Sequence, residues 1–183
     1  IGKLIPVDGG RYRADFQIFV VFQQRPIKSA SVTSTNLRAL AHGVSDIIYL
    51  TLTGIRGAFS TRILYVTMER MGPKKQRYRL YVADVDGHND RIILESPEPI
   101  LSPSWAPNGR HVAYVSFQST RPSIYIQDTV TGRQQKITGF PGLNGAPSFS
   151  PDGKQLAMVL SKDGNPEIYV MTLANGQLRR LTN

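Results

Sequence analysis

Ser102-Pro-Ser-Trp-Ala-Pro-Asn-Gly109 and Ala146-Pro-Ser-Phe-Ser-Pro-Asp-Gly153 are two copies of one motif, and they begin 44 residues apart. The same spacing continues downstream without a gap, so that Ile124-Tyr125 aligns with Ile168-Tyr169. Eleven of the 38 positions aligned from Ser102 onward are identical. Leu80–Asp84 adds part of an earlier copy at the same spacing. A repeat of constant length predicts a chain built from structural units of one kind.

Each repeat has the pattern of four short strands separated by turns. In the last copy the predicted strands are Pro147–Ser150, Leu156–Ser161, Glu167–Leu173 and Leu178–Thr182. The turns between them contain Asp-Gly or Asn-Gly, which supply the positive φ angles of tight hairpins. A four-stranded unit of about 40–45 residues has the size of a β-propeller blade. We therefore expect a mainly β chain in which residues 63–183 form about two and a half antiparallel blades of an incomplete ring.

The region before the repeats, residues 1–62, has a different pattern. Gly2–Val7 and Arg11–Phe22 are strand-like runs around Asp8-Gly9-Gly10, and Gln23-Gln24-Arg25-Pro26 is expected to end the second strand. Ser34 or Thr35 is then expected to cap a helix that stops at Gly54. The expected helix has one apolar stripe, formed by Leu37, Leu40, Ala41, Val44, Ile47, Ile48 and Leu52.

A hairpin and one helix are too small for a complete domain, so we interpret residues 1–62 as the latter part of an α/β domain. Two and a half blades are likewise too few to close a ring, which usually takes roughly four to eight. We expect the chain to be a fragment of a longer protein. The alternative is that two or more copies assemble and cover the exposed sheet face.

The composition is that of a globular protein, with 40% hydrophobic and 19% charged residues. No run approaches the roughly 20 apolar residues of a membrane-spanning helix. The net charge of +9 favours acidic partners, anionic polymers or nucleic acid without specifying one. The basic run Lys74–Arg79 contains a tyrosine, but it coincides with a predicted hairpin tip and strand, which favours a solvated surface over a nucleic-acid site.

The sequence offers no set of residues suited to catalysis. It has no cysteine, and its three histidines, His42, His88 and His111, lack the spacing of metal ligands. Neither a serine-hydrolase elbow nor a phosphate-binding loop is present. Asp84 and Asp86 lie on one face of a strand end beside a turn at Gly87, and acidic pairs at such turns are usual in hairpins. We expect a binding protein without enzymatic activity, cofactor or metal.

The segment Leu52-Thr-Gly-Ile-Arg-Gly-Ala-Phe-Ser-Thr-Arg-Ile63, which leads directly into the repeats, resembles the TolB family of the Tol–Pal cell-envelope system. The two repeat motifs, the Asp8-Gly9-Gly10 hairpin and the predicted helix fit the same family. The resemblance covers essentially the whole chain. The junction segment followed by blades is its most specific part, because peptidase-associated propellers share the Pro-Asp-Gly pattern.

This resemblance implies a periplasmic protein with an α/β domain and a six-bladed propeller, which takes part in outer-membrane integrity and cell division. Such proteins bind the lipoprotein Pal through the propeller and the inner-membrane protein TolA through an N-terminal strand, and colicins use the same propeller face. The TolA-contacting segment is expected to be absent from this chain. We expect neither membrane insertion nor nucleic-acid binding.

Loops that lead into the first strand of a blade belong to the Pal-binding face of that family. Aligned by motif, the implied partner-binding residues are Pro99, Ile100, Leu101, Ser102, Leu143, Asn144, Gly145 and Ala146. Some relatives have histidine at the position of Leu143. Two other functions stay open: a regulatory propeller of a peptidase, and a basic adaptor for nucleic acid or an anionic glycan.

Overall fold

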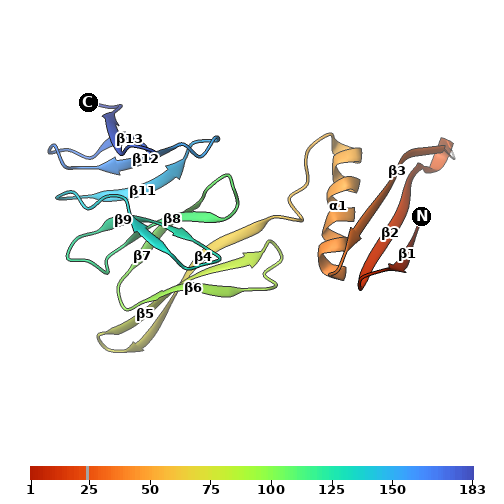
Figure 1. Ribbon diagram of the computed structural model, residues 1–183, viewed down its shortest axis with the longest axis horizontal. Coiled ribbons are helices and arrows are strands. Elements are labelled where there is room, and N and C mark those ends of the chain that lie inside the picture. The colour runs from red at the N-terminus through yellow and green to blue at the C-terminus, as the bar shows by residue number, and fades with distance from the viewer. Residues whose placement is uncertain (24) are drawn as a thin grey trace. The chain divides into compact units, whose positions relative to one another are not determined.

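The computed structural model describes residues 1–23 and 25–183 and divides the chain into two compact units. The first unit contains Ile1–Ile63 together with the turn Asp84–His88, and the second contains Leu64–Ala83 and Asn89–Asn183. The chain is mostly β-structure with one α-helix (Figure 1). No helix among the described residues is long and apolar enough to cross a membrane.

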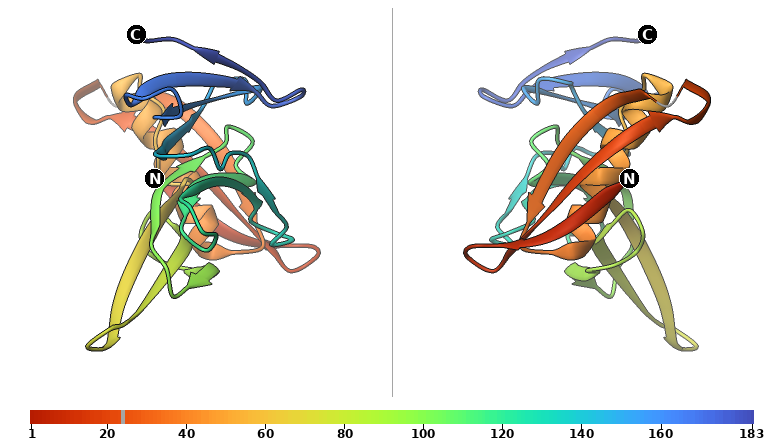
Figure 2. Two further views of the ribbon diagram at one scale, coloured as in Figure 1. Left: turned by 90° about the vertical axis from the view of Figure 1, so that its left-hand side faces the viewer. Right: turned by 90° about the vertical axis from the view of Figure 1, so that its right-hand side faces the viewer.

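The first unit is a three-stranded antiparallel sheet with one helix against it (Figure 2, right). Its strands are β1 (Gly2–Val7), β2 (Arg11–Val20) and β3 (Arg25–Ser34), in the order β1-β2-β3. A short 3-10 helix, η1 (Val21–Gln23), follows β2, and Gln24, which we expected to lie at the strand end, is outside the described residues.

The expected hairpin is thus extended by a third strand that the sequence did not predict. Pro26 suggested a break, but it lies in β3, where it pairs with Phe19 beside a register shift. Because β3 is an edge strand, it tolerates a residue that lacks a backbone donor.

The helix α1 (Leu37–Thr53) begins and ends with local hydrogen bonds. Its cap is Asn36, whose Oδ1 accepts from the backbone N–H groups of Arg38 at 2.8 Å and Ala39 at 3.2 Å, so the prediction of Ser34 or Thr35 was wrong. The predicted stop is confirmed, because Gly54 is in the left-handed region with φ 72°.

The apolar stripe of α1 is narrower than predicted. Leu40 is buried, and Val44, Ile47 and Ile48 are half-buried. The predicted stripe members Leu37, Ala41 and Leu52 are exposed. The sheet therefore covers only the central face of the helix.

The junction after α1 is tied back to the helix by Asp46. Its carboxylate accepts hydrogen bonds from the backbone N–H groups of Phe59 at 2.9 Å and Ser60 at 3.0 Å. Partial burial opposes ionisation, but hydrogen bonds from Ser60 and Phe59 outweigh it and lower the pKa of Asp46. A Cβ at Gly57 would lie 2.3 Å from the Oδ1 atom of this carboxylate, so the close approach requires glycine.

The turn that contains Asp84 and Asp86, Asp84–His88, belongs to the first unit. Gly87 has φ 81°, and the Oδ1 atom of Asp86 accepts from the backbone N–H of His88 at 3.0 Å. The Oδ2 atom of Asp86 also accepts a hydrogen bond from Arg38 and lies 3.1 Å from the Nε2 atom of His42. The carboxylate of Asp86 therefore stabilises a turn, as the sequence indicated.

The second unit contains three antiparallel sheets that follow one another in chain order as successive layers (Figures 1 and 2). The first sheet has three strands, β4 (Arg62–Gly72), β5 (Lys75–Asp84) and β6 (Arg91–Ser96). The second has four: β7 (Ile100–Trp105), β8 (His111–Ser116), β9 (Ser123–Asp128) and β10 (Gln134–Lys136). The third also has four: β11 (Asn144–Phe149), β12 (Gln155–Leu160), β13 (Glu167–Thr172) and β14 (Gln177–Arg180).

The 44-residue repeat thus corresponds to one four-stranded sheet, which confirms the predicted fold class. The motif turns behave as predicted, because Gly109 and Gly153 have φ 63° and 70°. The sheets form an open series, as expected for an incomplete ring of blades.

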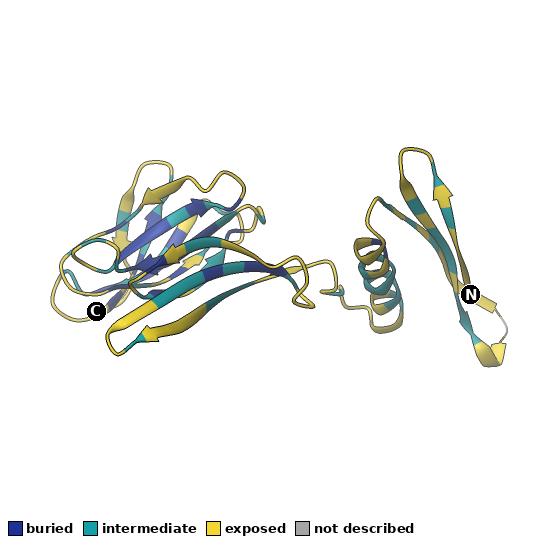
Figure 3. Ribbon diagram, turned by 90° about the horizontal axis from the view of Figure 1, so that it is seen from below, coloured by how far each residue is buried: buried dark blue, intermediate teal, exposed yellow. Residues whose placement is uncertain are grey.

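Strand β8 shows why the sheets stack, because it is buried on both faces. Val112 and Tyr114 belong to the core shared with Leu80 of the first sheet. Ala113 and Val115 belong to the core shared with the third sheet. Successive side chains of a strand point to opposite faces, so one strand supplies two interfaces. Figure 3 shows the buried residues concentrated in these stacked strands.

Candidate functional site

A cleft opens between the second and third sheets at the start of their first strands, β7 and β11. It has a volume of about 250 Å³, and we call it the inner-strand cleft. Its lining residues are Leu101, Ser102, Val115, Phe117, Pro122, Leu143, Asn144, Gly145, Ala146 and Val159. Six of the eight residues that the sequence pointed to are among them, and none of the ten is ionisable.

Both first strands carry the same irregularity at this cleft. The register shifts between Leu101 and Ser104 in β7, and between Gly145 and Ser148 in β11. At these bulges Ser102 and Ala146 have φ 48° and 47°, a left-handed conformation that is uncommon for residues with a Cβ. The two positions are equivalent in the repeat. The bulge is therefore part of the repeat itself and turns the backbone at the wall of the cleft.

Two of the predicted residues do not line the cleft. Ile100 is only 1% exposed and packs in the core between the first and second sheets. The carbonyl of Pro99 accepts a hydrogen bond of 3.3 Å from the backbone N–H of Phe117. Both residues support the start of β7 from inside.

Asn144 lines the cleft, but its side chain is fully buried and bound within its own loop. Its Oδ1 atom accepts from the backbone N–H of Phe140 at 3.1 Å. Its Nδ2 group donates to the carbonyls of Phe140 at 2.7 Å and Gly142 at 3.3 Å. Asn144 therefore shapes the loop Phe140–Asn144 and leaves no polar atom for a partner.

Two leucines present exposed side chains to the cleft. Leu101 is 47% exposed and Leu143 is 44% exposed. The backbone of Leu143 is held on both sides by Ser161, whose Oγ accepts its N–H at 2.7 Å and whose N–H donates to its carbonyl at 3.1 Å. Exposed apolar side chains on a fixed backbone suit a protein contact with little cost of ordering.

The contribution of Ser161 could not have been found from the sequence. It lies 18 residues after Leu143, and only the pairing of β11 with β12 brings the two together. The lining residues Phe117, Pro122 and Val159 were missed for the same reason, since each comes from another strand or loop.

The basic run Lys74–Arg79 is partly neutralised by acids on neighbouring strands. Arg79 donates to Glu95 at 2.7 Å and to Glu69 at 3.1 Å, and Arg77 lies 3.5 Å from Glu95. The hydrogen bond with Arg79 lowers the pKa of Glu95 and outweighs the opposing effect of desolvation. Paired charges along a strand indicate a solvated sheet face.

The described ranges 1–23 and 25–183 hold no cluster of three His, Cys, Asp or Glu side chains that could bind a metal. His111, the histidine closest to a hollow, contacts Asn108 rather than an acidic residue. The inner-strand cleft itself is apolar and lined by backbone bulges, leucines and other neutral residues. Such a surface is suited to binding.

Repeated four-stranded sheets that share their cores, with an apolar cleft where their first strands meet, define a β-propeller protein. The TolB beta propeller domain matches residues 49–183 of this chain. The chain belongs to the TolB β-propeller family.

Individual relatives agree with this assignment. The chain is 52% identical over 150 residues to the Tol-Pal system protein TolB of Marinomonas sp. (strain MWYL1), and 50% identical over 148 residues to that of Pseudomonas fluorescens (strain Pf0-1). Each match covers 80% of this chain and 34% of the relative, so the chain spans about a third of these proteins. A crystal structure of TolB from Acinetobacter baumannii is also similar, with 44% sequence identity and a TM-score of 0.87. The match covers 100% of this chain and 46% of that one.

Proposed function

We propose that this chain is a protein-binding scaffold of the Tol–Pal cell-envelope system in the periplasm, and that its inner-strand cleft contributes to binding the lipoprotein Pal. The relatives that carry the name Tol-Pal system protein TolB support membership of that system. A role in outer-membrane integrity and cell division would follow from it. Contacts with TolA and with colicins stay predictions of the family resemblance, as does the assignment of residues 1–62 to an α/β domain.

The observation that carries the Pal proposal is the rigid presentation of Leu101 and Leu143. Asn144 and Ser161 fix the loop by hydrogen bonds, and the bulges at Ser102 and Ala146 fix the strands beside it. The cleft lacks ionisable residues, so its contribution to affinity would come from apolar burial and shape. Binding through such a contact would depend only weakly on salt.

In the experiment, the soluble domain of Pal from Pseudomonas fluorescens is titrated into this chain, and the dissociation constant is measured by isothermal titration calorimetry. Leu143→Asp and Leu101→Asp place a charge in the apolar cleft, and each is expected to raise the dissociation constant about tenfold or more. Val130→Asp is the matched control, because Val130 is 73% exposed on the turn after β9. Circular dichroism melts check that all three variants stay folded.

Equal affinities of the two cleft variants and the control would remove the cleft from the Pal-binding site. A chain that stays folded and does not bind Pal at all would contradict the proposed function. A salt dependence as steep as that of a nucleic-acid complex would favour the basic-adaptor hypothesis instead.

A further inference from the structure

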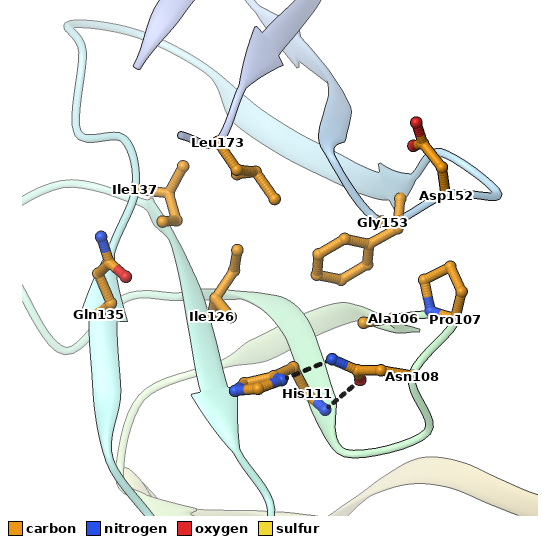
Figure 4. A pocket seen from close by; sticks show the side chains of 11 residues that line it. Ala106, Pro107, Asn108, His111, Ile126, Gln135, Ile137, Asp152, Gly153 and Leu173 are labelled. Atoms are coloured by element: carbon orange, nitrogen blue, oxygen red, sulfur yellow. Dashed lines mark hydrogen bonds between the residues drawn. The ribbon is translucent and has the colours of Figure 1, made fainter. Parts of the chain in front are cut away.

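A second hollow lies between the same two sheets, beyond the other end of β7. It has a volume of about 310 Å³ and adjoins a hollow of about 420 Å³, which shares the lining residues His111, Ile126 and Gln135 with it. We call the two together the inter-sheet groove. The motif turns, with Asn108 in one repeat and Asp152 in the next, form part of its rim (Figure 4).

One end of the groove is apolar. Ile126 and Ile137 come from the second sheet, and Phe149 and Leu173 come from the third. All four are half-buried and pack against the core between these sheets. This end could bury one apolar side chain without moving the backbone.

His111 is held as a hydrogen-bond donor at the other end. The Oδ1 atom of Asn108 accepts from the backbone N–H groups of Arg110 at 2.9 Å and His111 at 3.1 Å, which fixes the orientation of the amide. Its Nδ2 group then faces the Nδ1 atom of His111 at 2.9 Å (Figure 4). Nδ1 must accept, so the proton of the neutral ring is on Nε2, which points away from Asn108.

Arg133 provides a cation at the same end. Arg133 lines the groove, and its side chain makes no ion pair within the described residues. Asp128 lines the same hollow, but its carboxylate is already engaged, because it accepts from Arg110 at 2.6 Å and from the backbone N–H groups of Val130 and Thr131 at 2.8 and 3.1 Å.

Asp152 lies on the far rim and is likewise engaged. Its Oδ1 atom accepts from the hydroxyl of Ser150 at 2.6 Å and from the backbone N–H of Lys154 at 3.0 Å. The groove therefore combines an apolar end with a donor end formed by His111, Arg133 and the amide of Gln135.

We propose that the inter-sheet groove binds the free C-terminus of an extended polypeptide that ends in an apolar residue. The terminal carboxylate would accept from Arg133 and from the Nε2–H of His111, and the terminal side chain would enter the apolar end. An extended peptide fits better than a fatty acid, because β10 is an exposed edge strand beside the groove and can pair with a peptide backbone. This site is separate from the inner-strand cleft and does not depend on Pal binding.

The probes are acetyl-Gly-Gly-Leu as the free acid, the same peptide as its C-terminal amide, and decanoate. Each is titrated into isotope-labelled protein, and backbone amide shifts are followed by NMR. The free acid is expected to shift the amides of Gln135, Ile137 and Leu173 in a saturable manner. The amidated peptide is expected to bind about tenfold more weakly, because it cannot form the charge-assisted hydrogen bonds.

Arg133→Ala tests the charge. The backbone N–H and carbonyl of Arg133 would keep their turn hydrogen bonds with Thr131 and Asp128 in this variant. Its affinity for the free acid is expected to fall about tenfold. Arg121→Ala, which removes an equal charge from another loop, is the matched control and is expected to change the affinity less than twofold.

Three results would each overturn the proposal. The first is equal binding of the acid and the amide, and the second is an unchanged affinity of Arg133→Ala. The third is binding of decanoate with no shift from the peptide acid, which would identify a site for a lipid carboxylate instead.

Discussion

The substitution Asn144→Ala tests whether the buried asparagine holds the loop at the inner-strand cleft. The change removes three hydrogen bonds and leaves the N–H and carbonyl of Phe140 without the partners that they have now. An unsatisfied buried group costs about 1–3 kcal/mol, and Phe140 is only half-buried, so water can compensate part of this loss. We expect the free energy of unfolding to fall by about 2 kcal/mol, which corresponds to a decrease in Tm of roughly 4–8 °C.

Urea denaturation gives the change in unfolding free energy, and amide hydrogen exchange gives its location. The amide of Phe140 should exchange much faster in Asn144→Ala, because its acceptor is gone. Asn165→Ala is the control, since Asn165 is exposed in the turn before β13. If Asn144→Ala and Asn165→Ala unfold at the same urea concentration and the exchange at Phe140 is unchanged, the side chain of Asn144 does not stabilise this loop.

Three further predictions concern the rest of the chain. Tyr114→Phe should lower the unfolding free energy by about 1–2 kcal/mol, because the buried hydroxyl of Tyr114 donates to the Oε1 atom of Gln127 at 2.9 Å. Chemical denaturation measures the change, and an unchanged unfolding free energy would contradict this role of the hydroxyl. Asp128→Asn should flatten the loss of stability at acid pH. The hydrogen bond from Arg110 lowers the pKa of folded Asp128, so its contribution is fully present above the unfolded pKa of about 4 and is lost progressively as the pH falls from there toward the lowered folded pKa. Melting curves of both proteins between pH 3 and pH 7 provide the check, and the difference in Tm is expected to narrow toward the acid end. Gly57→Ala should lower the Tm by roughly 4 °C or more, because its Cβ would lie 2.3 Å from a helix carboxylate oxygen, whereas Gly72→Ala, with no neighbour in reach, should have a smaller effect in the same scan.

The repeat made most of the second unit predictable. Alternating apolar residues and Asp-Gly or Asn-Gly turns predicted Leu156–Ser161 and Glu167–Leu173, which the structure gives as β12 and β13 within one residue. Spacing between repeats then predicted the equivalent strands of the second sheet. These features are local in sequence, which is why the sequence is sufficient for them.

The misses come from interactions between distant residues. The first strand of the third sheet begins at Asn144 and not at Pro147, because a bulge allows Asn144 and Gly145 to pair with β12 before the predicted start. Likewise, β3 was missed because Pro26 suggests a break unless the strand is known to lie at a sheet edge.

The sequence predicted the position of the candidate site, but it did not predict which of its residues are exposed and which are buried. Motif alignment brought six residues to the cleft, and it could not tell the exposed Leu143 from the buried Asn144 beside it. That distinction depends on the side-chain amide of Asn144 closing its own loop. Of two neighbouring residues in a loop, one can thus be available to a partner while the other stabilises the fold. Only the hydrogen bonds in the structure distinguish these two roles.

The two-faced burial of β8 has a consequence for how such a chain can change over evolutionary time. Val112 and Tyr114 are constrained by the sheet before it, whereas Ala113 and Val115 are constrained by the sheet after it. Alternate positions of this single strand therefore pack against two different neighbouring sheets. A duplicated unit inherits both sets at once, so a new copy already fits between its predecessor and its successor, and its loops are free to diverge.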